Sequence, residues 1–231
     1  MTLQPLKSLI RKFKLPQPLH KKSFSQCGED MIAGFYLKGK KGFYIDVGAF
    51  HPKRISNTYY FYQKGWCGIN IDGSNKSIDL FRKYRPKDIN IHACVGMCEI
   101  DTEVNFYLFN TPELNTFDKA SLGRIEMYHN QKPIGIAKVP LRSLKSLLNE
   151  FLPKGQEIDL LTVDAEGADE DVLRSNDWQK YRPSVVIVEN HCSVGDFLQS
   201  GMYKYLSEMN YVIGGHSRHS YVFCDVLKFG Y

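Results

Sequence analysis

The sequence lacks the features that mark membrane-spanning, secreted or disulfide-bonded proteins. No apolar run approaches the ~20 residues that cross a bilayer, and the first residues lack the apolar core and small-residue cleavage site of a signal peptide. The six cysteines include no CxxC pair, so neither a disulfide framework nor a zinc site is expected. These absences predict a cytoplasmic protein.

The amino-terminal end has no acidic residue before Glu29, although the net charge of the whole chain is only +5. Six basic residues lie there, and apolar residues alternate with them at near-helical spacing: Lys7, Arg11, Lys12, Lys14, Lys21, Lys22 and Leu3, Leu6, Leu9, Ile10, Phe13. We interpret 1–22 as a basic segment, either a helix packed on the main domain (23–231) or a peripheral contact with an anionic membrane surface. No nucleic-acid-binding motif accompanies this charge, so nucleic acid is not an expected partner.

Short apolar stretches alternate with helical patterns along the rest of the 231 residues. Strands are expected over 43–48, 67–72, 89–95, 103–109, 158–163 and 185–188, with closing segments at 211–213 and 221–227. Helices are expected over 25–37, 55–64, 74–84, 143–151, 167–173 and 196–209, and 110–140 is expected to be irregular. This alternation predicts an α/β fold with a mostly parallel central sheet and helices on both faces.

Four of the expected strands end in an acid: Asp46, Asp72, Asp164 and Glu189. In parallel sheets, ligands bind beyond the carboxyl ends of the strands, where the strand order switches. Gly48 and Ala49 after the first strand would permit close approach of a ligand, and Asp72 is placed to accept a ribose diol. The four strand ends therefore predict a nucleoside site, with capped strand-end turns as the alternative.

The loop after Asp46 has one glycine, where the dinucleotide fingerprint GxGxxG has three. An acid beside the loop suits the cationic end of S-adenosylmethionine better than a pyrophosphate. A Rossmann oxidoreductase is therefore the weaker alternative.

Several stretches in order resemble the FkbM family of methyltransferases. They are 25–30 (SQCGED), 44–52 (YIDVGAFHP), 56–58 (SNT), 65–72 (GWCGINID), 161–167 (LTVDAEG) and 181–183 (YRP) running into Val188 and Glu189. The resemblance implies a Rossmann-like class I methyltransferase fold that uses S-adenosylmethionine, mostly on hydroxyls of sugars or natural products. Ala165 and Gly73 depart from the usual family residues, but neither change removes a functional group.

The resemblance also implies roles for the cofactor-binding residues. Asp46, Gly48 and Ala49 would line the methionine side, Asp72 would hold the ribose, and Cys94 and Val95 would flank the adenine. The helix that Gln26 opens would cover the cofactor. Val47, Gly73 and Ser74, which adjoin these residues, are also expected to contact the cofactor. Asp164 is expected to lie beside its methyl group.

Methyl transfer to an alcohol needs a group that removes the proton. Asp164, Glu166 and His51 are the candidate bases. Asp164, Glu189 and Asn190 also resemble the ligand set of metal-dependent O-methyltransferases, in which Mg²⁺ lowers the pKa of the attacking hydroxyl. Both schemes stay open, and His191 fits either.

The acceptor is expected to contact the long stretch 110–140, and less directly the carboxyl-terminal region. The candidates are Lys119, Arg124, Tyr128 and His129, then His216, Arg218 and His219. The expected acceptor is a sugar hydroxyl of a nucleotide-linked, lipid-linked or polymeric glycan, as in polysaccharide biosynthesis. The alternatives are a small natural product and a non-catalytic cofactor-binding module, and the acids at the methyl end argue against the module.

Overall fold

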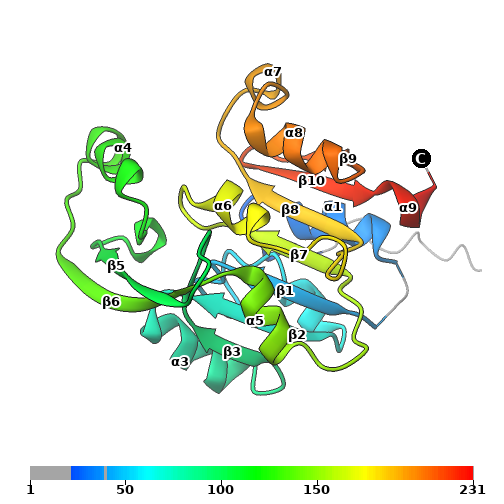
Figure 1. Ribbon diagram of the computed structural model, residues 1–231, viewed down its shortest axis with the longest axis horizontal. Helices are drawn as coiled ribbons and strands as arrows, with labels where there is room; N and C mark the ends of the chain where they lie inside the picture. Colours follow the sequence, from blue (N-terminus) through cyan, green and yellow to red (C-terminus); the bar gives the residue numbers. More distant parts are fainter. Residues whose placement is uncertain (1–21, 39–40, 231) are drawn as a thin grey trace, which may run out of the picture.

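The computed structural model describes residues 22–38 and 41–230 (Figure 1). The helix expected in the basic amino-terminal segment therefore lies outside the described residues. No helix in the described ranges is long and apolar enough to cross a membrane.

Seven strands form the central sheet in the order β3-β2-β1-β7-β8-β10-β9. They are β1 (Phe43–Val47), β2 (Cys67–Asp72), β3 (Ile89–His92), β7 (Leu160–Val163), β8 (Val185–Glu189), β9 (Tyr211–His216) and β10 (Ser220–Asp225). The first five in this order pair in parallel, and β10 runs antiparallel to both neighbours. The chain moves outward from β1 to β3 and then returns to place β7 on the other side of β1. The order therefore switches between β1 and β7, and the expected mostly parallel fold is confirmed.

Helices cover both faces of this sheet (Figure 1). They are α1 (Glu29–Tyr36), α2 (Tyr59–Gln63), α3 (Asn75–Tyr84), α5 (Leu144–Phe151), α6 (Asp169–Arg174), α7 (Val194–Phe197), α8 (Gly201–Glu208) and α9 (Val226–Phe229). Alternate residues of β1 point to opposite faces: Ile45 joins the core under α5 and α8, whereas Tyr44 joins the core under α1 and α2. Both faces are apolar, which explains the continuous hydrophobic strands.

Residues 110–140 are not irregular, and that expectation is wrong. They contain η2 (Pro112–Leu114), α4 (Lys119–His129) and the start of β6 (Gly135–Arg142), which pairs with β5 (Thr102–Leu108) and β4 (Cys94–Val95) in a second sheet. Asp118 caps α4, and the left-handed Asn130 ends it. We call 102–142 the arm, because it projects from the main sheet (Figure 1). The expected strand 89–95 is accordingly split between the two sheets.

Three expected helices have different bounds, each for a local reason. The first begins only at Glu29, because Gly28 before it is left-handed (φ 92°). The second begins at Tyr59, because the backbone of Ile55 also has a positive φ of 50°. The expected helix over 196–209 is two helices, and the second, α8, is capped by Ser200, whose Oγ accepts from Tyr203 N–H at 3.1 Å.

A fully buried arginine lies beneath the loop that follows β1. Arg85 donates from Nη2 to Ser56 Oγ (2.7 Å), from Nη1 to Thr58 Oγ1 (2.7 Å) and from Nε to Pro52 O (2.8 Å). Thr58 in turn donates to Asp46 Oδ2 at 2.5 Å. Because these groups satisfy one another in the interior, they fix loop 52–58 beside the carboxyl end of β1.

Candidate active site

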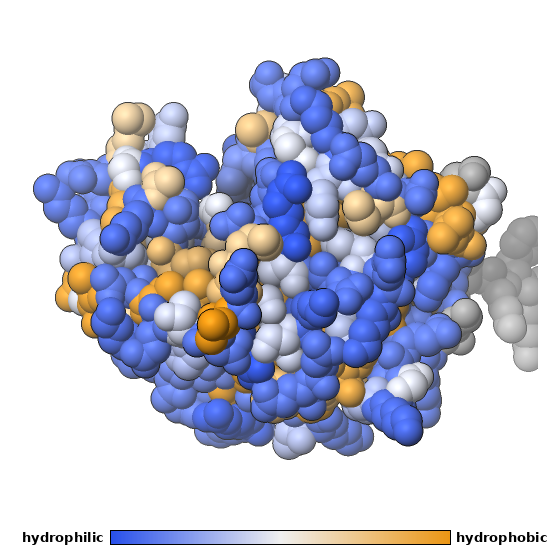
Figure 2. Space-filling model, viewed as in Figure 1, coloured by the Kyte–Doolittle hydropathy of each residue, from blue (hydrophilic) through white to orange (hydrophobic). Residues whose placement is uncertain are grey.

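A cavity of about 330 Å³ opens at the carboxyl ends of β1, β2, β7 and β8, at the switch in strand order. Figure 2 shows a notch in this face between the α4 end of the arm and the region of α7 and α8. The wall is formed by Gln26, Val47, Gly48, Phe50, Ile55, Asp72, Gly73, Ser74, Ser77, Ala93, Cys94, Val95, Phe106, 111–117, His129, Asp164, Ala165, Glu166, Glu189 and His191.

Gly48 sets the shape of the loop after β1. Its φ is +74°, and a Cβ at this position would lie 1.7 Å from the carbonyl oxygen of Asp164. Gly48 and Ala49 both donate their N–H groups to Ile71 O, at 3.0 and 3.1 Å. Glycine is therefore required for the loops after β1 and β7 to meet, in addition to any approach of a ligand.

Asp72 has a constrained carboxylate in the cavity wall. Oδ2 accepts from Phe50 N–H (2.8 Å) and Oδ1 accepts from Ser74 N–H (2.6 Å). Burial outweighs these hydrogen bonds and raises the pKa of Asp72 to about 6. Each carboxylate oxygen accepts more than one hydrogen bond, so both retain capacity for a ligand diol.

Beyond Asp72 the wall becomes apolar and narrow. Gly73 lies so close to Phe106 that a Cβ would be 2.6 Å from the ring. Ala93, Cys94 and Val95 add small or branched side chains to the same wall, and the arm closes it with Phe117. This arrangement forms a slot suited to an aromatic ring.

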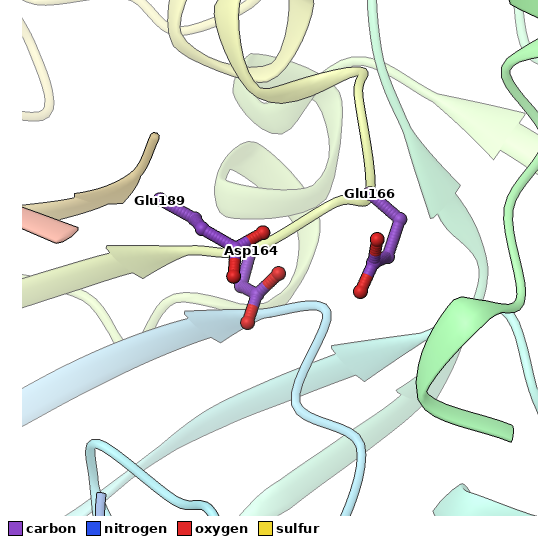
Figure 3. Close-up of side chains that lie close together, drawn as sticks. All are labelled: Asp164, Glu166 and Glu189. Atoms are coloured by element: carbon purple, nitrogen blue, oxygen red, sulfur yellow. The ribbon is translucent and has the colours of Figure 1, made fainter. Parts of the chain in front are cut away.

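Three carboxylates meet at the opposite end of the cavity. Oxygens of Asp164, Glu166 and Glu189 all lie within 4.8 Å of one another (Figure 3). Asp164 and Glu189 are hydrogen-bonded to each other, while Asp164 Oδ1 is buried with no hydrogen-bond partner. A buried oxygen without a partner is uncommon and marks a position for a ligand group.

The backbone of Glu166 is strained, with φ at 49°. Its carbonyl oxygen accepts hydrogen bonds from Thr116 Oγ1 and Ser121 Oγ, both at 3.0 Å. Both donors belong to the arm. The arm therefore holds the loop after β7 in the conformation that points Glu166 toward the other two acids.

Burial and mutual repulsion separate the pKa values of these acids. Burial and the charge of Glu189 raise the pKa of Asp164 well above its usual range, and the same two causes raise the pKa of Glu166 to about 8. Burial also acts on Glu189, but hydrogen bonds from His191 (Nε2–Oε1 3.4 Å) and Asp164 outweigh it and lower the pKa of Glu189. Asp164 therefore holds its proton to a higher pH than Glu189 does.

Four residues chosen from the sequence for direct roles do not line the cavity. The carboxylate of Asp46 accepts from Thr58, and burial raises its pKa to about 6; Ala49 is buried behind the loop. His51 Nδ1 accepts from the N–H groups of Lys53 and Arg54 at 3.0 and 3.1 Å, and Asn190 Oδ1 accepts from Cys192 N–H at 2.9 Å. Their side chains have structural partners, so Glu166 rather than Asn190 completes the acid cluster.

Of the expected acceptor contacts, His129 alone lines the cavity. Arg124 donates to Ser121 Oγ at 2.8 Å, and Tyr128 is 76% exposed. His219 Nδ1 lies 2.9 Å from His191 Nδ1 and so adjoins the wall from outside. The structure adds wall residues that the sequence did not single out, chiefly Phe50, Ile55, Ser77 and Phe106, and 111–117 belong to the stretch expected to contact the acceptor. Most of them reach the cavity only because the arm folds back over the strand ends.

Comparison with known proteins agrees with this geometry. The family model described as the methyltransferase FkbM domain matches residues 46–213, which is well over half of the chain. The match contains both loops that meet at Gly48 and the whole arm. No curated protein matches the sequence. The chain therefore belongs to the FkbM methyltransferase family.

Proposed function

We propose that this protein is an S-adenosylmethionine-dependent O-methyltransferase that acts on a hydroxyl of a sugar or glycan intermediate. The observation that carries the proposal is one cavity with a diol acceptor, Asp72, at one end and the cluster of Asp164, Glu166 and Glu189 at the other. The bound cofactor would supply an electrophilic methyl group on its sulfonium.

The residues present fit the cofactor. Asp72 would accept hydrogen bonds from the ribose diol. The slot formed by Gly73, Ser74, Cys94 and Val95 would hold the adenine, and Gln26, Val47 and Gly48 would border the methionine end. This leaves the acid cluster beside the reacting methyl.

Glu166 is the proposed base. Its pKa is raised to about 8, which lies close to physiological pH, and a general base is most effective when its pKa is near the working pH. A hydroxyl held beside it would give up its proton to the carboxylate as the oxygen bonds to the methyl carbon and the sulfur–carbon bond breaks. Asp164 and Glu189, joined by a hydrogen bond, would orient the acceptor.

The rate of methyl transfer should rise with pH and level off above about 8. The reason is that burial raises the pKa of Glu166 to about 8, so the carboxylate form grows as pH rises through that value. Initial rates at saturating substrates across the range measure this. Glu166→Gln should remove the inflection from the pH–rate curve. The same inflection in the variant would show that another group titrates.

Replacing Asp72 with alanine should weaken S-adenosylhomocysteine binding by roughly 1.5–3 kcal/mol, as expected for lost charge-assisted hydrogen bonds. Calorimetric titration measures the change. Asp79→Ala, an exposed acid of α3 paired with Arg82, is the matched control. Because Asp72 also fixes the N–H groups of Phe50 and Ser74, Asp72→Asn separates loss of charge from loss of shape. Equal affinity in all three variants would remove the ribose role.

A magnesium-assisted version is also supported by a specific observation. The donor set is three carboxylates within 4.8 Å, with one buried oxygen unpartnered, which suits a hard cation. Asp164, Glu166 and Glu189 would hold Mg²⁺, which would lower the pKa of the acceptor hydroxyl.

Chelation should abolish activity if the cation is required, and Asp164→Asn should do the same, because an amide is the weaker ligand. Without a cation, Asp164→Asn should be tolerated, since its amide still donates to Glu189 as the protonated acid does. Activity after chelation, and after Mg²⁺ is added back, measures this. Full activity in both tests would eliminate the metal.

Transfer of a labelled methyl group to sugar acceptors tests the chemistry itself. An ether product resists alkali, whereas a methyl ester is cleaved. Label recovered only in esters or amines would contradict O-methylation. Label found in a small natural product instead of a glycan would favour that alternative acceptor.

We also propose that the protein works in the cytoplasm, since all six cysteines are free thiols, as in reducing compartments. Peripheral membrane contact through residues 1–22 stays a proposal from their charge pattern.

A further inference from the structure

The charge of the cavity wall is one-sided. Its described residues include five carboxylates and no lysine or arginine, although the chain has 30 lysines and arginines against 25 acids. The carboxylates are Asp72, Glu113, Asp164, Glu166 and Glu189. The basic side chains in the wall are those of two histidines, His129 and His191. This wall offers an anion no lysine or arginine, and those of its acids that are ionised attract cations.

Three of the five acids lie together at the end of the cavity opposite Asp72. Asp164, Glu166 and Glu189 form the cluster at the ends of β7 and β8. Glu113 comes from η2 of the arm, where its side chain is exposed at the wall. These acids therefore surround the space that the acceptor would occupy.

Basic residues of α4 do not line the cavity, although the charge of Arg124 reaches Glu166. The guanidinium of Arg124 bonds to Ser121 Oγ at 2.8 Å and lies near Gly167, next to Glu166. Lys119, at the start of α4, is exposed. Neither residue lines the cavity, and His191 is already paired with Glu189. A phosphate or carboxylate inside would therefore meet acids without a compensating lysine or arginine.

Given the methyl transfer proposed above, on which this depends, we propose that the reacting end of the acceptor is a neutral or amino-substituted polyol, and that phosphorylated or carboxylated sugars are rejected there. Whether an acid of this wall is ionised or protonated, an anion beside it gains no cationic partner, and each ionised acid repels an anion and attracts an ammonium. In a nucleotide-linked or lipid-linked acceptor, the pyrophosphate would lie outside the cavity, on the side where Lys119 and Arg124 are exposed.

Saturation-transfer NMR of the full-length protein tests this with three matched probes: glucosamine, glucose and glucose 6-phosphate. Each is titrated at neutral pH and low salt, with divalent cations removed by chelation, into protein saturated with S-adenosylhomocysteine. We expect glucosamine to bind most tightly and glucose 6-phosphate at least about tenfold more weakly than glucosamine, with the difference shrinking at high salt. Equal binding of the three, tighter binding of the phosphate, or no binding of glucosamine would each overturn the proposal.

A pair of variants locates the effect. Glu113→Gln should reduce the preference for glucosamine over glucose 6-phosphate by about threefold or more, because it removes one wall charge. Glu126→Gln changes an exposed acid of α4 that is paired with Lys132 outside the wall, and should leave the preference unchanged. An equal change in both variants would contradict a local effect.

S-adenosylhomocysteine binding is measured in the same samples. If it fails while the probes still rank as expected in cofactor-free protein, the methyltransferase function fails and the charge preference stands. If the cofactor binds and the ranking is absent, the charge preference alone fails.

Discussion

Replacing Gly48 with alanine should destabilise the protein by about 2–5 kcal/mol and abolish cofactor binding. A left-handed residue other than glycine costs about 1–2 kcal/mol, and overpacking adds about 1–3 kcal/mol. The overpacking is severe here, because the new Cβ would lie 1.7 Å from the carbonyl oxygen of Asp164. The loops after β1 and β7 must then separate, and both line the cavity.

Gly65→Ala is the matched control. Gly65 has a similar φ of +85°, but a Cβ there meets nothing within 4 Å. The Gly65→Ala variant should therefore lose only about 1–2 kcal/mol of unfolding free energy, the cost of a left-handed alanine, and keep its affinity for S-adenosylhomocysteine. Urea unfolding of the two variants measures the difference. Equal stability and equal affinity would show that the contact at Gly48 is not a constraint.

Replacing Glu166 with glutamine should lower the rate of methyl transfer by about 10²–10⁴-fold, the range expected for loss of a general base. Glutamine keeps the shape of the side chain but accepts no proton. Affinity for S-adenosylhomocysteine should change little, because the adenine and ribose contacts lie at the other end of the cavity. Single-turnover rates and calorimetry separate the two effects.

Glu170→Gln is the control for this substitution, since Glu170 lies four residues further on in α6 and pairs with Arg174. It should retain the wild-type rate. A Glu166→Gln enzyme as fast as Glu170→Gln would remove Glu166 from the chemistry and leave the cluster with a structural role.

The sheet and the cofactor end were predictable from sequence because both depend on local patterns. Strands such as β1 and β7 are buried on both faces, so they read as continuous apolar runs that stop at Asp46 and Asp164. The strand-end acid Asp72 and the single Gly48 then follow from the general position of ligands in parallel sheets.

The strand β5 was expected, but the rest of the arm was missed, because its local sequence signals are weak. In β6 the exposed residues include Lys138 and Pro140, and their polarity hides the alternation that pairs this strand with β5. Wall residues such as Phe106 reach the cavity only through that pairing. Local sequence patterns contain no information about such non-local contacts.

Polar residues near strand ends were over-interpreted for a physical reason. His51 and Asn190 follow strands, as catalytic groups often do, but each satisfies backbone N–H groups of its own turn. The buried Arg85 was overlooked, because its partners Ser56 and Thr58 lie far away in sequence and a buried arginine is rare without such partners.

Calorimetric titration of the purified protein with S-adenosylhomocysteine, alongside NAD(H), tests the central claim most directly. The structure of the cavity predicts micromolar binding of one S-adenosylhomocysteine per chain, lost in Gly48→Ala and retained in Gly65→Ala, with no binding of NAD(H). Binding of NAD(H) instead, or of neither compound, would contradict the assignment of this cavity to a methyl donor.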